Sequence, residues 1–325
     1  MNINNYTMES TCPFTAEDVI NIKDITIDKV KHDYKNLTDF DALTNPRKFC
    51  GNPTIYKYQM RNLLNCRRGN KGYTTLEEEL NDPVLNQELW RQTLQRNRRD
   101  KSPANAIDVY ECHRINRGAI VPFKASTAKY IYKMFGATNV LDPTAGWGGR
   151  LLGASSLGIQ YTGLDTNINL KKGYDSMIKD LDIKNCHMFY EDCLSFPFDM
   201  INPDLILTSP PYSNMELYEH MDAWKNDYHF NTSFMIPLLK KIDEETCCRV
   251  CLNISPKMYE QLIKKYNVRP CDSQVDLRQQ LGQQYKTKSQ DYIYIWDKDY
   301  NILYKKIMKS SYKLMNILMS VLTRS

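Results

Sequence analysis

The expected fold follows from the glycine-rich turn Asp142-Pro143-Thr144-Ala145-Gly146-Trp147-Gly148-Gly149, which comes directly after an apolar run. Residues 139–141 have strand character, and residues 150–154 have a helical pattern. Glycines at such a turn permit a tight bend and let a ligand approach the backbone closely. A glycine turn alone is explained equally well as a sharp connection. The pattern predicts a strand, a turn and a helix, with a candidate ligand site at the turn.

The next apolar run favours a ligand at this turn. Residues 159–164 end at Asp165, about twenty residues after the glycines, where an acidic residue accepts hydrogen bonds from a ribose. A helix N-cap is the alternative role for Asp165, and we favour nucleoside binding. The glycine spacing differs from the Gly-x-Gly-x-x-Gly pattern that is usual in dinucleotide-binding sites. No Gly-Lys-Ser/Thr follows the glycines, which excludes a Walker-type phosphate loop. A carboxylate at Asp142 would repel a pyrophosphate and suits a cationic ligand such as S-adenosylmethionine.

A second signature, Thr208-Ser209-Pro210-Pro211-Tyr212, follows the apolar run 204–207. In an open α/β sheet, ligands bind in the crevice beyond the carboxyl ends of the strands, so both signatures are expected to face one cleft. By itself the second signature is best explained as an ordinary turn after a buried strand. Together with the glycine turn and Asp165, it indicates a catalytic loop.

The two signatures together resemble those of the amino-methyltransferases, S-adenosylmethionine-dependent enzymes that methylate exocyclic amines of nucleobases. The resemblance covers roughly residues 117–298 and implies a Rossmann-like α/β methyltransferase fold with a mainly parallel sheet flanked by helices. It also implies that the last strand, 291–296, is antiparallel. Glu191 is a less favoured candidate than Asp192 for holding the adenine amino group. The residues assigned to the cofactor are Lys124, Asp142, Pro143, Ala145, Gly146, Gly148, Asp165, Asp192, Cys193 and Thr208.

The second signature supplies the expected chemistry. An exocyclic base amine is a poor nucleophile because its lone pair is delocalised into the ring. Two acceptors that hold the amino hydrogens, the Ser209 side chain and the Pro210 carbonyl, would direct that lone pair toward the methyl donor. Pro210 and Pro211 hold the loop rigidly because their φ is fixed. Tyr212 would stack on the flipped-out base.

The serine before Pro-Pro-Tyr favours one substrate. In the resembling family, serine is commonest in enzymes that methylate N4 of cytosine, and Asp or Asn is commoner for N6 of adenine. The leading expectation is therefore a DNA methyltransferase specific for cytosine N4, as in restriction-modification systems. The alternatives are adenine N6 of DNA, an RNA base, a protein glutamine, and a methyltransferase-fold binding subunit without activity.

Length and composition bound the organisation. The 325 residues, 42% of them hydrophobic, are enough for one substantial α/β domain and a smaller companion. We expect a mostly helical region at 1–115, the methyltransferase domain at 116–300 and a basic amphipathic tail at 301–325. A capping box at 74–78 and Leu/Trp spacing over 85–94 predict helices in the first region. The tail is expected to dock on its own domain.

Cysteine usage and hydropathy predict the environment of the chain. Ten scattered cysteines suit a reducing compartment, and Cys247, Cys248 and Cys251 are more typical of a buried strand than of a zinc site. With no 18-residue apolar stretch and no charged leader, the chain is expected to be intracellular and soluble, without a membrane partner.

Positive charge is concentrated in one part of the sequence. Residues 47–124 contain 15 Lys/Arg and 8 Asp/Glu, an excess of +7 against +5 for the whole chain. This clustering favours contact with nucleic acid, although a solvated basic helix face explains any single residue nearly as well. Sequence recognition is expected from the N-terminal region, from 213–230 with Glu216, Tyr218, His220, Trp224 and Tyr228, or from 268–289 with Arg278, Gln279, Gln280, Gln283 and Gln284. Core packing explains Trp224 and Tyr228 equally well, and the glutamine-rich run is more typical of a solvated loop than of base readout.

Overall fold

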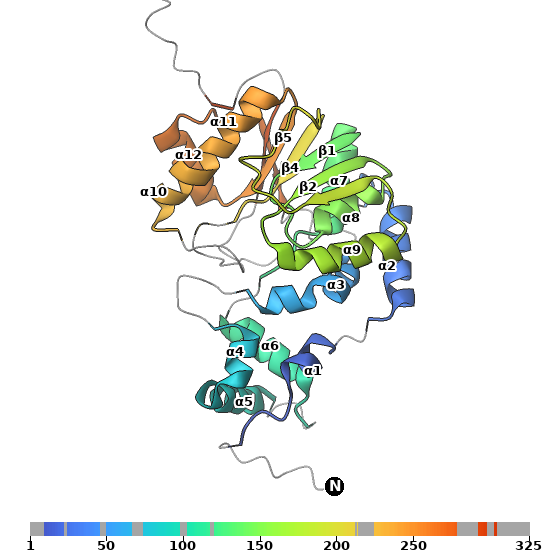
Figure 1. Ribbon diagram of the computed structural model, residues 1–325, viewed down its shortest axis with the longest axis vertical. Helices are drawn as coiled ribbons and strands as arrows, with labels where there is room; N and C mark the ends of the chain where they lie inside the picture. Colours follow the sequence, from blue (N-terminus) through green and yellow to red (C-terminus); the bar gives the residue numbers. More distant parts are fainter. Residues whose placement is uncertain are drawn as a thin grey trace, which may run out of the picture.

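A twisted seven-stranded sheet forms the centre of the protein, with its strands in the order β3-β2-β1-β4-β5-β7-β6 (Figure 1). The computed structural model describes residues 10–22, 25–45, 50–66, 74–97, 103–117, 120–211, 213, 224–277, 292–297 and 302–303. The neighbouring pairs from β3 to β5 are parallel, whereas β7 is antiparallel to both β5 and β6. The strands are β1 Asn139–Asp142, β2 Gln160–Leu164, β3 Cys186–Phe189, β4 Leu205–Thr208, β5 Arg249–Ile254, β6 Ser273–Asp276 and β7 Tyr292–Trp296.

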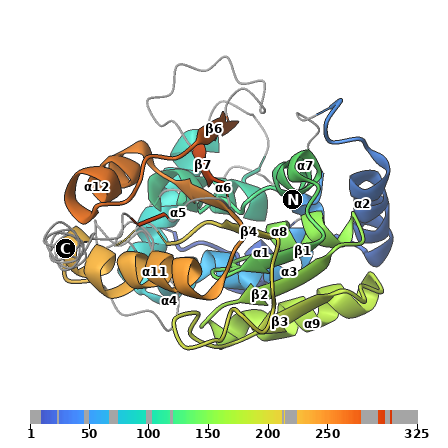
Figure 2. The same cartoon turned by 90° about the horizontal axis from the view of Figure 1, so that it is seen from above.

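Apolar residues on both faces of the strands explain why helices cover the sheet on both sides. In β4, Leu205 and Leu207 belong to one core and Ile206 to the other, as the two-residue period of a strand requires. Figure 2 shows the two helical layers, with α11 and α12 on one side and α2, α7 and α8 on the other. The covering helices are α7 Ala125–Phe135, α8 Gly149–Ser155, α9 Lys171–Asp180, α10 Asp227–Phe230, α11 Ile236–Glu245 and α12 Pro256–Tyr266.

The strand order places a switch point between β1 and β4. From β1 the chain proceeds outward to β2 and β3, then returns to β4 on the other side of β1. The two central strands pair in parallel, with Val140 opposite Leu205. Crevices at such switch points are the usual ligand sites of open α/β sheets. The expected Rossmann-like fold class, with a mainly parallel sheet and an antiparallel last strand, is confirmed.

The N-terminal helices divide between two cores. Helix α2 packs on the sheet, where the buried Lys129 ammonium donates hydrogen bonds to the carbonyls of Leu37, Thr38 and Phe40 at its C-terminal end. Another core surrounds the fully buried Trp90 and forms a helical lobe below the sheet in Figure 1. The N-terminal helices are α1 Ala16–Ile20, α2 Ile27–Asp39, α3 Asn52–Leu64, α4 Leu76–Asn81, α5 Pro83–Asn97 and α6 Ala106–Arg117.

Helix α3 connects the two cores. Its residue Ile55 packs in the core on the sheet, whereas Met60 and Leu64 pack in the core of the helical lobe. The mostly helical character expected before residue 115 is confirmed, and the expected capping box forms at Thr75 with Glu78. The division of the chain at residue 115 stays a prediction. Of the tail, only residues 302–303 lie within the described part of the chain.

One strand was not expected. Among the described strands, β6 lies at the edge of the sheet and pairs with β7, and its short, half-polar sequence Ser-Gln-Val-Asp carries little strand signal. It falls inside the segment 268–289 considered for target recognition. The arginine and glutamines at 278–284 lie outside the described residues.

Candidate active site

A cleft with a volume of about 330 Å³ lies at the carboxyl ends of the central strands. Both sequence signatures contribute to its walls, as does the acidic end of β2. Seven of the predicted site residues line it, namely Pro143, Gly146, Asp165, Asp192, Cys193, Ser209 and Pro211. The structure therefore brings together residues that are up to 68 positions apart in sequence, at the switch point of the sheet.

Backbone conformation and a hydrogen bond from α9 fix the glycine turn. Gly146 adopts a left-handed φ of 62°, and an added Cβ there would meet nothing closer than 3.9 Å. The Tyr174 hydroxyl of α9 donates a hydrogen bond to the Gly146 carbonyl at 2.8 Å. Gly148 has a φ of 93°, and a Cβ there would approach the Met177 side chain to 3.1 Å. Glycine is thus favoured by the backbone conformation at both positions, and a Cβ at Gly148 would also be crowded by the Met177 and Tyr174 side chains.

Asp165 links the end of β2 to the glycine turn. Its Oδ2 accepts a hydrogen bond from the Gly146 N–H, and its Oδ1 accepts one from the Asn167 N–H, both at 2.9 Å. Burial of the carboxylate raises the pKa of Asp165 to about 6, although both hydrogen bonds favour its charged form. Each oxygen keeps a lone pair for a further donor. Asp165 is therefore placed to accept hydrogen bonds from ligand hydroxyls in the cleft.

Asp142 occupies a different place from the one its sequence position implied. Its side chain is fully buried and does not line the cleft. Its Oδ2 accepts hydrogen bonds from Arg150 Nε at 2.6 Å and from the Tyr161 hydroxyl at 2.7 Å. Its Oδ1 accepts one from the Thr208 hydroxyl at 2.9 Å. The negative charge is thus balanced by Arg150 inside the fold, and the direct attraction for a cationic ligand that we inferred for this carboxylate has no support in the geometry.

The bonds around Asp142 fix the two loops relative to each other. Burial has the largest single effect and lowers the pKa of Arg150, but the charge and hydrogen bond of Asp142 together with the neighbouring Tyr161 and Tyr132 raise that pKa overall, so the guanidinium stays charged. Thr208, at the end of β4, also accepts a hydrogen bond from the Thr144 N–H at 3.2 Å. The glycine turn after β1 and the Ser-Pro-Pro loop after β4 therefore share one buried polar network.

The Ser209 side chain is oriented by a residue that we did not select from the sequence. Its hydroxyl donates a hydrogen bond to Oδ1 of Asn253 at 3.1 Å. The Asn253 Nδ2 in turn donates to the Tyr292 carbonyl at 3.0 Å, which fixes the amide's orientation. Because the hydroxyl hydrogen is directed at Asn253, the lone pairs of Ser209 remain available as acceptors in the cleft. A buried Asn inside the apolar strand β5 was the sequence signal for this role.

The remaining predicted residues lie around the cleft or outside the described residues. Tyr212 is outside them, as are Glu216, Tyr218 and His220. Pro210 is buried next to the lining residues Ser209 and Pro211. Burial lowers the pKa of Lys124, which precedes α7. The predicted residues that do not line the cleft are Lys124, Asp142, Ala145, Gly148, Thr208 and Pro210.

Aromatic side chains form part of the wall of the cleft. Trp224 and Phe234 line it, with their ring centroids 6.1 Å apart, and Phe230 packs behind Trp224. Ser233 and Phe234 belong to a short π-helix, Asn231–Met235, that precedes α11. Such π-helical turns are frequent at functional sites. Trp224, named above for target recognition, lines the cleft and also packs against the core, whereas the Tyr228 side chain is exposed.

The cleft is acidic. Its described lining contains three carboxylates, Asp165, Glu191 and Asp192, and no Lys or Arg. A site of this sign attracts cations and disfavours phosphates.

No group of three or more His, Cys, Asp or Glu with metal-binding geometry occurs among the described residues. Within the same residues, the helices are too short or too polar to cross a bilayer. Cys248 and Cys251 are buried at strand β5, and Cys247 is exposed.

Comparisons with known proteins give structural similarities only. An rRNA methylase from Streptococcus thermophilus is 9% identical, with a TM-score of 0.37, and the match covers 55% of this chain and 99% of that one. TrmN from Thermus thermophilus is 14% identical, with a TM-score of 0.39, over 54% of this chain and 48% of that one. An RNA methyltransferase from Salinibacter ruber, solved with S-adenosyl-L-homocysteine, is 14% identical, with a TM-score of 0.36, over 58% and 97%.

No protein-family model and no curated protein matches the chain.

Proposed function

We propose that this protein is an S-adenosylmethionine-dependent methyltransferase that acts on an exocyclic amine of a nucleic-acid base, with N4 of cytosine in DNA as the leading target. The observation that carries the proposal is the convergence of Gly146, Asp165, Asp192 and Ser209 in one cleft of about 330 Å³. Cofactor-type residues and a candidate catalytic hydroxyl thus share a space of the size that small ligands occupy.

The cleft suits a cationic nucleoside. Its three carboxylates favour a ligand that carries a sulfonium and an ammonium over one that carries a pyrophosphate. Asp165, with its pKa raised to about 6 by burial, would accept hydrogen bonds from the ribose hydroxyls. Asp192 would hold the adenine amino group, and the open backbone at Gly146 would face the methionine part. When bound, the cofactor supplies an electrophilic methyl group.

The loop after β4 would prepare the acceptor. Ser209 directs its own hydrogen to Asn253 and keeps its lone pairs for one hydrogen of the substrate amine. The Pro210 carbonyl would accept the other, which draws the nitrogen lone pair out of conjugation with the ring. The network around Asp142 would keep this loop at a fixed distance from the glycine turn. The Trp224 and Phe234 wall offers apolar surface for a flipped base.

Transfer of an isotope-labelled methyl group tests the proposal. The intact protein would be incubated with labelled S-adenosylmethionine and, separately, with double-stranded DNA, single-stranded DNA, RNA and a glutamine-containing peptide. Label in a nucleic acid supports the proposal, and the acceptor identifies the polymer. Label in the peptide alone would replace it with the glutamine alternative. If the cofactor binds and no acceptor is labelled, the chain is the inactive binding subunit considered from the sequence.

A further inference from the structure

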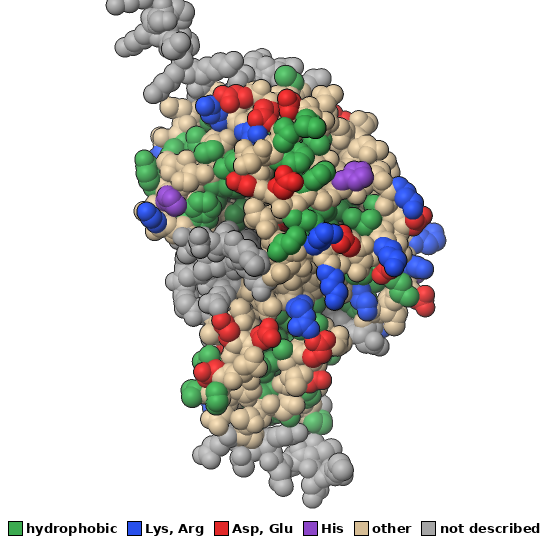
Figure 3. Space-filling model, viewed as in Figure 1, with side chains coloured by type: hydrophobic (Ala, Val, Ile, Leu, Met, Phe, Trp, Pro, Cys, Tyr) green, Lys and Arg blue, Asp and Glu red, His purple; other side chains and the backbone are tan. Residues whose placement is uncertain are grey.

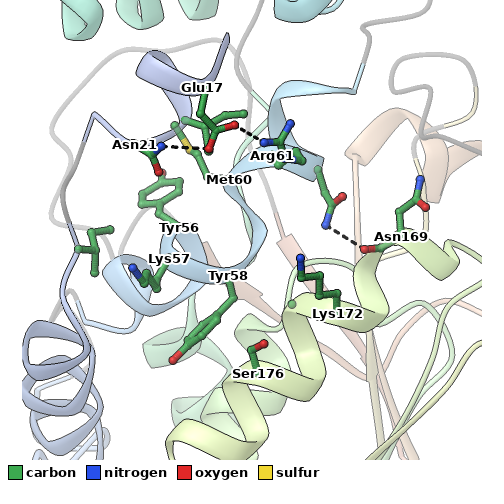
Figure 4. A pocket seen from close by; sticks show the side chains of 14 residues that line it. Glu17, Asn21, Tyr56, Lys57, Tyr58, Met60, Arg61, Asn169, Lys172 and Ser176 are labelled. Carbon is green, nitrogen blue, oxygen red and sulfur yellow. Dashed lines mark hydrogen bonds and ion pairs between the residues drawn. The ribbon is translucent and has the colours of Figure 1, made fainter. Parts of the chain in front are cut away.

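A second pocket, of about 450 Å³, lies where the helical lobe meets the sheet, between α1, α3 and α9 (Figure 4). We call it the groove. Figure 4 shows Lys57 and Arg61 from α3, Lys172 from α9 and Glu17 from α1 around it. These four are the charged residues in its described lining, so its net charge is +2. The groove thus has the opposite sign to the acidic cleft.

Two cations in the groove have no ion-pair partner among the residues that the structure describes. Arg61 forms an ion pair with Glu17, and Glu17 also accepts a hydrogen bond from Asn21 at 3.0 Å. Lys57 and Lys172 are exposed and make no ion pair with any residue that the structure describes. Figure 4 shows Lys172 pointing from α9 toward Arg61, and Figure 3 shows Lys and Arg side chains gathered over α3 and α9. Unpaired ammonium groups in a hollow are typical of sites that bind phosphate oxygens.

The floor of the groove is rigid. A Cβ at Gly173 would meet the Tyr58 carbonyl at 2.5 Å, so α3 and α9 are in backbone contact there. The buried Gln59 amide donates a hydrogen bond to the Leu170 carbonyl at 3.3 Å, and the Asn62 amide donates one to the Asn169 carbonyl at 3.3 Å. The lysines therefore project from a fixed surface.

The groove adjoins the active-site cleft. The 3-10 helix Ile168–Leu170 separates them: Asn167 and Leu170 line the cleft, and Asn169 lines the groove. On its other side, the groove shares Ile25 and Tyr56 with a further pocket of about 480 Å³, which Lys29 and His32 also line. Consecutive hollows that lead to the cleft fit a polymer better than a single small anion.

We infer that the groove binds the phosphodiester backbone of the nucleic-acid substrate, with Lys57 and Lys172 contacting phosphates and Tyr56 and Tyr58 offering apolar surface beside them. This inference deepens the proposed function and takes its substrate class from it. The phosphodiester chemistry is shared by DNA and RNA, and the experiment separates the two.

The test is equilibrium binding of labelled single-stranded DNA, double-stranded DNA and single-stranded RNA, measured by fluorescence anisotropy without cofactor. The double variant Lys57→Glu/Lys172→Glu should bind the preferred polymer at least about tenfold more weakly. Between about 50 and 200 mM salt, the slope of log affinity against log salt should be shallower by about 1.5, because two phosphate contacts are lost. The polymer with the largest loss is the one that the groove holds.

A matched control separates the groove from bulk charge. Lys179→Glu/Lys265→Glu changes the net charge equally at two exposed lysines outside the groove, and should weaken binding by less than about twofold. A Lys57→Gln/Lys172→Gln variant should show an intermediate loss. S-adenosylhomocysteine affinity should be unchanged in all three double variants, since none of the substituted residues lines the cleft. Thermal unfolding should also be unchanged, because all four lysines are exposed.

Equal weakening in the charge-reversal variant and its control, unchanged binding in the groove variant, or no binding by the wild type would each overturn the inference. The proposed function can fail separately. If the groove variant loses binding while the wild type labels no nucleic acid, the groove stands and methyl transfer does not. If the wild type labels nucleic acid and the groove variant binds it normally, methyl transfer is supported and phosphate binding in the groove is not.

Discussion

The candidate active-site cleft and the groove lie on opposite sides of one short 3-10 helix and are built in opposite ways. The cleft is acidic, and the bonds of Asp165 and the Asp142–Arg150 pair lie largely inside the fold. The groove is basic, and Lys57 and Lys172 are exposed on its walls. Buried, bonded groups hold a small ligand in one orientation, whereas exposed charges attract a polymer in a salt-dependent manner. This difference is the basis on which we propose a cationic cofactor for the cleft and an anionic substrate for the groove.

The largest expected effect distinguishes the buried charges from the exposed ones. Arg150→Met leaves the fully buried Asp142 carboxylate without its cation and should lower the free energy of unfolding by about 3–5 kcal/mol. Lys172→Met, in the groove, should change it by no more than about 0.5 kcal/mol. Urea denaturation measures both. If both variants changed the free energy of unfolding by similar amounts, the contrast between a preorganised cleft and a solvated groove would be wrong.

The next effect concerns catalysis within the cleft. Ser209→Ala removes one acceptor for the substrate amine and should lower turnover about a hundredfold, with S-adenosylmethionine affinity nearly unchanged. Ser233→Ala, which removes another hydroxyl from the lining of the cleft, serves as the control and should leave turnover close to the wild type. Steady-state kinetics and calorimetry measure the two quantities. Equal losses of turnover and cofactor affinity in Ser209→Ala would contradict the role assigned to this hydroxyl.

Asn253 should have a smaller effect through the same hydroxyl. Asn253→Leu frees the Ser209 hydrogen to point into the cleft, where it competes with the amine. A misdirected hydrogen bond costs roughly 1.5–2 kcal/mol, which corresponds to a ten- to thirtyfold loss of turnover. In a double-mutant cycle, Asn253→Leu should have little further effect once Ser209 is Ala. Additive losses would mean that Asn253 acts independently of Ser209.

The smallest effect is a pH dependence that the groove should not share. With the pKa of Asp165 at about 6, its ionised fraction rises about tenfold between pH 5 and pH 7. Ribose hydroxyls favour the ionised carboxylate, so S-adenosylhomocysteine affinity should rise by up to about tenfold over this range. Asp165→Asn should flatten the profile, as measured by calorimetry. A wild-type profile without this rise would contradict the assigned contact.

The same raised pKa has a defined effect on stability. The folded state holds the Asp165 proton more tightly than the unfolded state, in which the pKa is close to 3.8. The contribution of this group to stability is therefore fully present below about pH 4 and declines as the pH rises to about 6. Asp165→Asn should remove this decline from the pH dependence of urea unfolding.

The sheet and its central site were accessible from sequence because their signals are local. The apolar runs predicted the central strands, and β7 lies within one residue of its expected bounds. Glycine positions and the acidic end of β2 identified the cleft. The Asp142–Arg150 pair was not predicted, because charge alone does not tell whether a carboxylate faces a ligand or the interior.

The groove and the positioning role of Asn253 depend on long-range contacts. Lys57 and Lys172 are 115 positions apart, and no spacing rule relates them. The basic excess over 47–124 indicated nucleic-acid contact without indicating where. Asn253 meets Ser209 only because β4 and β5 are neighbours in the sheet. These features required the three-dimensional arrangement of the strands and helices.

The most direct test of the shared cleft is a crystal structure of the protein with S-adenosylhomocysteine. The account predicts that the ribose hydroxyls lie within hydrogen-bonding distance of Asp165, that the adenine lies near Asp192, and that the sulfur faces Ser209. Binding at another location, or a sulfur directed away from Ser209, would contradict it.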